Sequence, residues 1–234
     1  MRVGFSRAIF LEAAFIIVFS LILMGPHAAS AQSADAAQQQ FADAWMAAIK
    51  SQDVAKVKAL FHPATLDCIN DSNRDFFDFN FKEELRAGAG LGMSYHIESI
   101  NSLSRPPPMG GFPADGFAFP VEPTHQLQID AETKDHRTMI LLRFLAQANG
   151  RWYTVDPCLN AKGLTLFAQQ RAESERQMAE GAALATGMPE SLRTDIKPLL
   201  AQGHWFDATD CYREANGADL GTAVKVINAM AAEK

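Results

Sequence analysis

Cysteine and histidine are the residues of this 234-residue chain whose side chains most readily carry out chemistry. The cysteines are Cys68, Cys158 and Cys211, and no two of them are close enough for a CxxC redox motif. Their spacing from the histidines is not typical of a zinc site, and the sequence has no P-loop, dinucleotide-binding or serine-nucleophile motif. We therefore expect no metal and no cofactor. A structural disulfide is the leading interpretation of Cys158, and its partner stays open at this point.

Five histidines follow residue 31, and an ordinary polar or capping role is the leading interpretation of each. They are His62, His96, His125, His136 and His204. None of them forms an HxH or HExxH pattern, so the sequence indicates no histidine-based metal centre.

The first 31 residues have the composition of a secretory signal peptide. Arg2 and Arg7 precede an apolar run of 12 residues, and a small-x-small site ends at Ala31. A membrane-spanning helix requires roughly 20 apolar residues, so we expect cleavage, with an uncleaved anchor as the alternative. The mature chain is then expected to be periplasmic or secreted, without a stable membrane anchor.

The charge of the chain disfavours one class of partner. Cleavage would remove two arginines and one glutamate, which changes the net charge from −6 to about −7, and no run of basic residues survives. Nucleic acids and anionic membranes bind basic surfaces, so neither is expected as a partner.

In an oxidising compartment cysteines tend to pair, and an odd number leaves one thiol free or available for a bond between chains.

Apolar periodicity predicts three helices near the start of the mature chain. Residues 35–50 carry one apolar stripe, and residues 51–63 predict a short second helix, N-capped by Ser51 or Asp53 and ended by its final proline. Residues 72–88 predict a third helix, although four phenylalanines within six residues keep a strand as the alternative.

The apolar period then changes to that of strands. Residues 93–103 and 124–132 alternate, and residues 137–157 predict two strands joined by Asn149-Gly150, a strong hairpin signal. Residues 105–123 hold six of the eleven prolines, which disfavour a central strand. This segment is predicted to be a long loop that packs over the domain through its phenylalanines, with disorder as the alternative.

A two-residue turn sets the register of the hairpin. Ala146 is expected opposite Tyr153, and Arg143 opposite Asp156 as a cross-strand ion pair. One face, expected to meet the helices, carries Leu142, Phe144, Ala146, Tyr153 and Val155. The other face, expected to be covered by the C-terminal helices or a second subunit, carries Leu141, Arg143, Leu145, Trp152, Thr154 and Asp156.

Three helices followed by an antiparallel sheet resemble the NTF2-like (SnoaL-type) α+β cone. "FADAWMAAIKSQDVAKVKALFHP" is similar to the opening helix pair of that family, and "NGRWYTVDPC" is similar to its closing hairpin. The resemblance covers roughly residues 35–159 and implies a curved sheet around a pocket roofed by the helices. The family includes isomerases, dehydratases, hydrolases and non-enzymatic binders, so the fold does not decide the function.

The resemblance implies a pocket lined by aromatic and aliphatic side chains. The expected lining is Phe41, Trp45, Tyr95, Phe117, Phe119, Leu142, Phe144, Tyr153 and Val155. His96 and Asp156 could form an acid–base pair across such a pocket, as in some members of the family. The hairpin register, however, places Asp156 away from the expected pocket face.

The family geometry also brings the loop after the second helix near the end of the last strand. It therefore implies a Cys68–Cys158 disulfide across 90 residues of sequence. In the chain-entropy model, such a closure stabilises a fold by about 4 kcal/mol.

The C-terminal region is predicted to be helical throughout. Residues 161–188 predict a connecting helix, and residues 189–234 predict a helical hairpin. Within it, residues 195–230 resemble the helix-turn-helix of the ribosomal protein L7/L12 C-terminal region. The shared pattern includes a helix that ends at "YREANG", with Gly217 as its left-handed stop. The resemblance implies a compact helical hairpin that serves either packing within the chain or contact with another protein. Cys211 on this hairpin is expected to be a buried free thiol, with a bond between chains as the alternative.

The sequence thus predicts an α+β protein in four parts. These are a signal peptide (1–31), an NTF2-like domain (32–160), a connecting helix (161–188) and a helical hairpin (189–234). The favoured function is an exported, non-catalytic binding or interaction protein, because the expected pocket face has no histidine or carboxylate in the hairpin. The alternative is a small acid–base enzyme that acts on an apolar substrate. A small apolar ligand, a protein partner at the C-terminal helices and a second copy of the chain are the partners left open.

Overall fold

The computed structural model describes residues 36–104 and 113–232, so the expected signal peptide and Phe112 lie outside the described residues. The predicted α+β class is confirmed, with eight helices and two antiparallel sheets in the described chain. None of the described helices combines the length and hydropathy needed to cross a membrane. The chain divides into two compact units, whose boundary falls between Gln170 and Arg171. The predicted limits at residues 160 and 188 stay a prediction.

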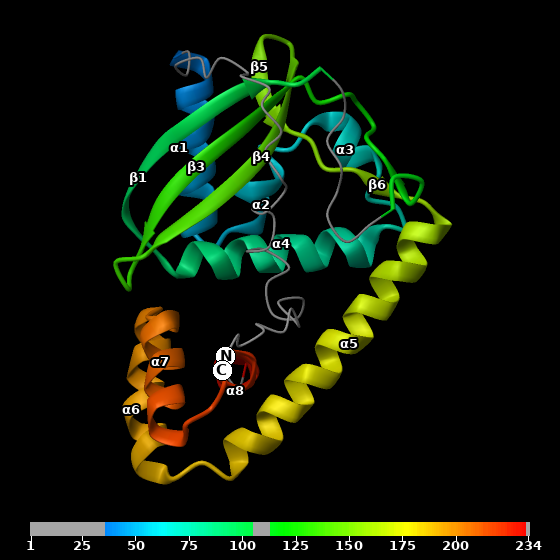
Figure 1. Ribbon diagram of the computed structural model, residues 1–234. Helices are drawn as coiled ribbons and strands as arrows, with labels where there is room; N and C mark the ends of the chain where they lie inside the picture. Colours follow the sequence, from blue (N-terminus) through cyan, green and yellow to red (C-terminus); the bar gives the residue numbers. More distant parts are fainter. Residues whose placement is uncertain (1–35, 105–112, 233–234) are drawn as a thin grey trace, which may run out of the picture. The chain divides into compact units, whose positions relative to one another are not determined.

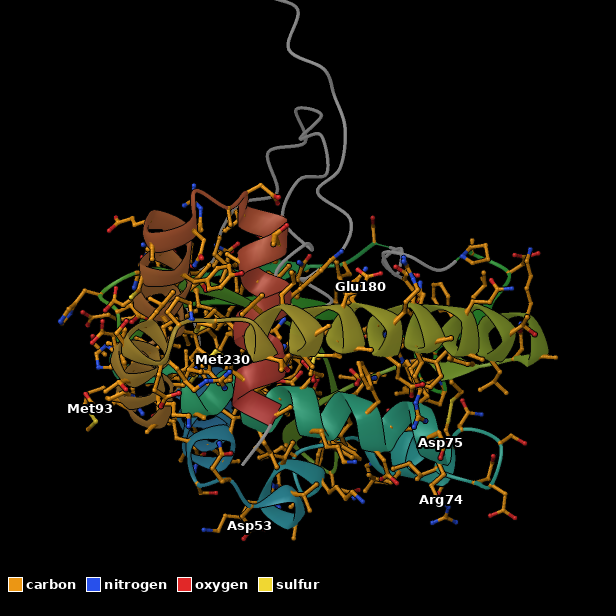
Figure 2. The ribbon with its side chains drawn as sticks, turned by 90° about the horizontal axis from the view of Figure 1, so that it is seen from below. Asp53, Arg74, Asp75, Met93, Glu180 and Met230 are labelled. Carbon is orange, nitrogen blue, oxygen red and sulfur yellow. A yellow bond between two sulfur atoms is a disulfide. The ribbon has the colours of Figure 1, made fainter. Side chains whose placement is uncertain are left out.

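Four helices open the first unit, and their bounds agree with the predicted periodicity except at one point. They are α1 (Ala36–Lys50), α2 (Val54–Lys58), α3 (Pro63–Asp67) and α4 (Arg74–Ala89). Asp53 caps α2 as expected, because its carboxylate accepts a hydrogen bond from the Ala55 amide at 2.9 Å. Figure 2 shows Asp53 at the start of α2, and Arg74 with Asp75 at the start of α4. The prediction missed α3, because Pro63 both follows the second helix and begins the next one at its first position.

The strands form a four-stranded sheet of order β1-β3-β4-β5 and a separate two-stranded sheet. The bounds are β1 (Leu91–Ser102), β2 (Phe117–Ala118), β3 (His125–Thr133), β4 (Thr138–Ala148), β5 (Arg151–Thr154) and β6 (Cys158–Leu159). The predicted long loop therefore contains a short strand, β2, which pairs with β6. Beyond it, Phe119 packs edge-on against Phe144 of β4 with ring centroids 6.1 Å apart. This part of the loop therefore packs against one face of the sheet at Phe144.

The hairpin register is confirmed. Ala146 pairs with Tyr153 and Ala148 with Arg151, and both turn residues, Asn149 and Gly150, have positive φ angles of 52° and 74°. A two-residue turn of this type needs positive φ at both central positions, which Asn and Gly tolerate best.

The prediction of which sheet face meets the helices is wrong. Leu145 and Trp152 are 0% and 8% exposed, and they belong to the core that contains the aromatic residues of α1 and α4. In Figure 1, α1 lies behind the sheet. The helices of the first unit therefore cover the face that was expected to need the C-terminal helices or a second subunit.

The neighbouring strand explains this reversal. On β3, the partners of Arg143 and Leu141 are Leu127 and Ile129, both fully buried. The register partners of Leu142 and Phe144 are glutamines instead, at positions 128 and 126. Each hairpin face is apolar by itself, but only one stays apolar across the sheet, and burial of that face removes more apolar surface from water.

The predicted Cys68–Cys158 disulfide is confirmed, and it joins the end of α3 to the first residue of β6. The chain before α3 runs along β5, because the His62 amide donates to the Thr154 carbonyl at 2.9 Å. Nδ1 of His62 also accepts from the Ala64 amide at 3.1 Å and caps α3, as expected for an ordinary histidine.

The second unit is helical and holds more than the predicted hairpin. Helix α5 (Ala161–Thr186) spans the boundary between the units, and α6 (Glu190–Gln202), α7 (Trp205–Asn216) and α8 (Leu220–Ala232) follow. Gly217 ends α7 with φ of 62° as predicted, and Gly203 ends α6 in the same way with φ of 85°. Lys225 of α8 forms an ion pair with Glu180 of α5 at 3.1 Å, and Figure 2 shows Glu180 on α5.

Cys211 on α7 is a free thiol that is partly buried against the core of the second unit. Burial raises the pKa of this thiol, and the nearby carboxylates of Asp195 and Glu214 raise it further. Because the thiolate is the reactive form, these surroundings favour an inert thiol over a nucleophile.

Candidate functional site

Arg143 carries a charged side chain into the core of the first unit. It stands on β4 in phase with Leu141 and Leu145, so strand alternation directs it toward the helices. Its guanidinium lies over the indole ring of Trp45 on α1, 4.3 Å from the ring centroid. The flat cation stacks on an aromatic face and shields that face from water.

Glu84 of α4 is the ionic partner of Arg143. Nη2 of Arg143 donates to Oε2 of Glu84, and Nη1 donates to the Leu142 carbonyl at 2.7 Å. The two charged side chains are only 15% and 16% exposed, so little water screens the pair. Ion pairs of this kind lose much of their hydration, which makes them sensitive to loss of either partner.

Asp156 adds a second carboxyl group to this ion pair. Burial raises the pKa of Asp156 to about 6, since the opposing effect of Arg143 is weaker and the charge of Glu84 acts in the same direction as burial. Burial likewise raises the pKa of Glu84, with Arg143 opposing it. We call Trp45, Glu84, Arg143 and Asp156 the Arg143 cluster.

Several polar atoms on this side of the sheet have no hydrogen-bond partner among the described residues. They are Nε1 of Trp45, Nε of Arg143, Nε1 of Trp152 and Oγ1 of Thr154, all buried. A buried donor without an acceptor costs about 1–3 kcal/mol, and such groups in a native fold call for an explanation such as water or a ligand. Two of the four belong to side chains in contact, Trp45 and Arg143.

His96 and Asp156, the two residues considered for an acid–base pair, are not brought together, in agreement with the hairpin register, which placed Asp156 away from the expected pocket face. His96 stands opposite Asp130 on the exposed face of β1 and β3, whereas Asp156 belongs to the helix-facing side. The hairpin register did place Asp156 on the same face as Arg143, as expected. The predicted ion pair between them is replaced by Arg143–Glu84, and Asp156 stays close enough to sense both charges.

The nine residues of the expected pocket do not share one wall. Phe41 and Trp45 are in the core, with their rings stacked at 6.2 Å. Tyr95 donates a hydrogen bond to Asp43 near the surface, and burial raises its pKa to about 12. Phe119 and Phe144 contact each other across the opposite face of the sheet, which is also the face of Leu142.

The other expected lining residues are held in local packing. Phe117 contacts the ring of Phe119 at 5.8 Å, and Tyr153 lies edge-on to His62 at 5.9 Å. Val155 is fully buried, and its amide donates to the Phe144 carbonyl at 2.8 Å. Only Phe41 and Trp45 of the nine therefore remain candidates for a site beside Arg143.

Glu84 is the residue of this cluster that the sequence interpretation missed. A usable signal existed, because Phe77, Phe81 and Glu84 are spaced i, i+4 and i+7 and so share one helix face. Two of these positions are buried aromatics, which predicts that the carboxylate at the third position also points toward the core.

The raised pKa of Asp156 gives a pH-dependent prediction. The fold favours the protonated carboxyl, so the contribution of Asp156 to stability is largest at low pH and is lost as pH rises from about 4, the ordinary value, through about 6. An Asp156→Asn variant does not titrate there. We expect its unfolding free energy, relative to wild type, to increase by about 2 kcal/mol between pH 4 and pH 7. Urea titrations of both proteins at each pH measure this difference, and a constant difference would contradict the raised pKa.

The Arg143 cluster combines an aromatic surface, one cation, two carboxyl groups and unpaired donors on the helix-facing side of the sheet. The unpaired donors would be satisfied by acceptor atoms, and the pKa of Asp156, raised to about 6, lies in the range of proton exchange near neutral pH. In comparisons with known proteins, no protein-family model, no curated protein and no solved structure matches this chain.

Proposed function

We propose that this chain is an exported, non-catalytic binding protein that holds a small ligand beside Arg143, between α1 and the sheet of an NTF2-like cone. The observation that carries the proposal is the pair of buried donors, Nε1 of Trp45 and Nε of Arg143, which have no acceptor among the described residues. A ligand with oxygen acceptors would supply the hydrogen-bond partners that no described side chain provides.

The chemistry of the cluster favours a neutral, mainly apolar ligand with an accepting oxygen such as a carbonyl. Phe41 and Trp45 supply apolar surface, and Arg143 is already neutralised by Glu84. An anionic group would lie near the Glu84 and Asp156 carboxyls, and the low polarity of the site strengthens that repulsion. Neutral oxygen acceptors avoid the repulsion and satisfy the donors.

Export is supported by two features of the chain. The Cys68–Cys158 bond is of the kind that persists in oxidising compartments. The basic start, short apolar run and small-x-small site of residues 1–31 are typical of a secretory signal peptide.

A fluorescent ketone tests the binding proposal. The probe is 6-propionyl-2-(dimethylamino)naphthalene, a neutral aromatic ketone whose emission shifts in apolar surroundings. We expect saturable binding to the wild-type chain, and 3- to 10-fold weaker binding to Trp45→Phe, which keeps an aromatic ring but removes the indole donor, because one hydrogen bond contributes about 0.5–1.5 kcal/mol. The matched control is Trp205→Phe, which removes an indole from the second unit and should bind as wild type does.

A second probe tests the preference for a neutral ligand. Anilinonaphthalene sulfonate has a similar aromatic body and an anionic group, and we expect it to bind more weakly than the ketone. Tighter binding of the sulfonate would overturn the assigned ligand class. Absence of saturable ketone binding, or equal affinities of Trp45→Phe and wild type, would overturn the binding proposal itself.

Asp156 favours one alternative function, an acid–base enzyme. Its pKa of about 6 lies in the range where a carboxyl group can both accept and release a proton near neutral pH. If it acts as a base, the chain should speed the exchange of the ketone's α-hydrogens for deuterium in heavy water, and Asp156→Asn should abolish this. The binding proposal expects exchange at the rate of buffer alone, which proton NMR measures directly.

A further inference from the structure

Three side chains with metal-ligating atoms converge on the exposed face of β1 and β3, on the opposite side of the sheet from the Arg143 cluster. His96 and Glu98 come from β1 and Asp130 from β3, and His96 stands directly opposite Asp130 in the register. One atom of each, the ring Nε2 or a carboxylate oxygen, lies within 4.8 Å of the other two. The set belongs to no part of the proposed ligand site.

An irregularity in β1 helps to place these ligands together. The register shifts between Ile97 and Ser99, so Glu98 has no register partner on β3, as the extra residue of a β-bulge would. Bulges bend a strand and redirect side chains, and they occur frequently beside functional sites. Here the register shift lies directly after His96. Oε2 of Glu98 is 3.3 Å from Nε2 of His96.

The distances suit a small divalent cation. Nε2 of His96 lies 3.3 Å from Oε2 of Glu98 and 4.0 Å from Oδ2 of Asp130. Zinc bonds to imidazole nitrogen and carboxylate oxygen are about 2.0–2.2 Å long, so tetrahedral ligand atoms stand roughly 3.4 Å apart. Small side-chain movements would bring the three atoms to that separation.

Asp130 is oriented by a neighbour on its own strand. Nε2 of Gln128 donates to Oδ1 of Asp130 at 3.1 Å, which leaves Oδ2 facing His96. Support of this kind for a ligating carboxylate is a regular feature of metal sites, because it fixes the direction of the ligand atom. His96 and Glu98 are 66% and 53% exposed, so an ion from solvent can reach the set.

We propose that His96, Glu98 and Asp130 form a surface site for a divalent cation of the zinc class, with solvent at the remaining coordination position. One imidazole and two carboxylates form a mixed nitrogen and oxygen set that Zn²⁺ accepts, whereas Mg²⁺ prefers oxygen ligands and retains its waters. Histidine spacing along the sequence could not reveal this site, because the ligands are joined by strand pairing across 34 residues.

Calorimetric titration of the mature chain with Zn²⁺ tests the site. We expect one Zn²⁺ per chain and at least a 10-fold loss of affinity in His96→Ala, with a similar loss in Asp130→Asn. The matched control is His136→Ala, which removes another exposed imidazole that contacts a carboxylate on the same sheet, Glu132, at 2.8 Å. This control should bind as wild type does.

Two results would overturn the proposal. One is the absence of stoichiometric Zn²⁺ binding to the wild-type chain. The other is an affinity that is unchanged in His96→Ala, or reduced equally in His136→Ala. Circular dichroism of each variant shows whether the sheet is intact, and the exposure of His96 makes loss of the fold in His96→Ala an unexpected outcome.

Discussion

Replacement of Cys68 and Cys158 together by alanine is expected to lower the free energy of unfolding by about 4 kcal/mol. The bond closes a sequence separation of 90 residues that includes α4, β1, β3 and the whole β4–β5 hairpin. Without it the unfolded chain gains conformational freedom, whereas the native contacts on either side of the bond are unchanged. Urea denaturation of the double variant and of wild type under non-reducing conditions measures the difference.

Cys211 provides the matched control for this experiment. It is a free thiol in the second unit, and Cys211→Ala is expected to change the same unfolding transition by less than about 1 kcal/mol. A double variant as stable as wild type would contradict the stabilising role of the bond. Peptide mapping without reduction should also recover Cys68 and Cys158 as one linked pair.

Arg143→Met is expected to destabilise the first unit by about 3–5 kcal/mol at pH 7, because it leaves the Glu84 carboxylate without its cation in a site that little water reaches. Asp156, which Arg143 also stabilises in its charged form, adds to the effect. The double variant Glu84→Gln/Arg143→Met removes both charges of the pair and should recover most of the loss. Chemical denaturation of the single and double variants measures this coupling.

An exposed arginine on the same hairpin serves as the control. Arg151 of β5 lies over the Tyr153 ring at 5.6 Å, and Arg151→Met should cost less than about 1 kcal/mol. If Arg143→Met and Arg151→Met were equally mild, the Arg143–Glu84 pair would not be part of the buried structure. If the double variant were no more stable than Arg143→Met, the loss would come from packing rather than from the unpaired carboxylate.

The fold was predictable wherever one local signal decided the structure. Asn149-Gly150 specified the turn and the register of the hairpin, and Asp53 and Gly217 marked the ends of helices. The face of the hairpin was not predictable from the hairpin alone, because both of its faces are apolar. Only the pairing with β3, which sets Leu127 beside Arg143, distinguishes the buried face.

The candidate sites were harder to predict for the same reason. Arg143 and Asp156 were placed correctly on one face, but Glu84 reaches them from α4, and no sequence spacing reports a contact between a helix and a sheet. His96 and Asp130 are likewise joined by pairing between β1 and β3. Contacts of this kind depend on strand order, which a single sequence does not specify.

Nitrogen-15 correlation NMR of the tryptophan indoles tests the proposed binding site most directly. The chain has three tryptophans, at positions 45, 152 and 205, whose indole signals can be assigned with single phenylalanine variants. On titration with the naphthalene ketone, we expect the Trp45 indole N–H signal to shift to saturation, as its unpaired donor gains an acceptor, while the Trp205 signal stays fixed. A ketone-saturated sample in which the Trp45 signal is unmoved would contradict the account.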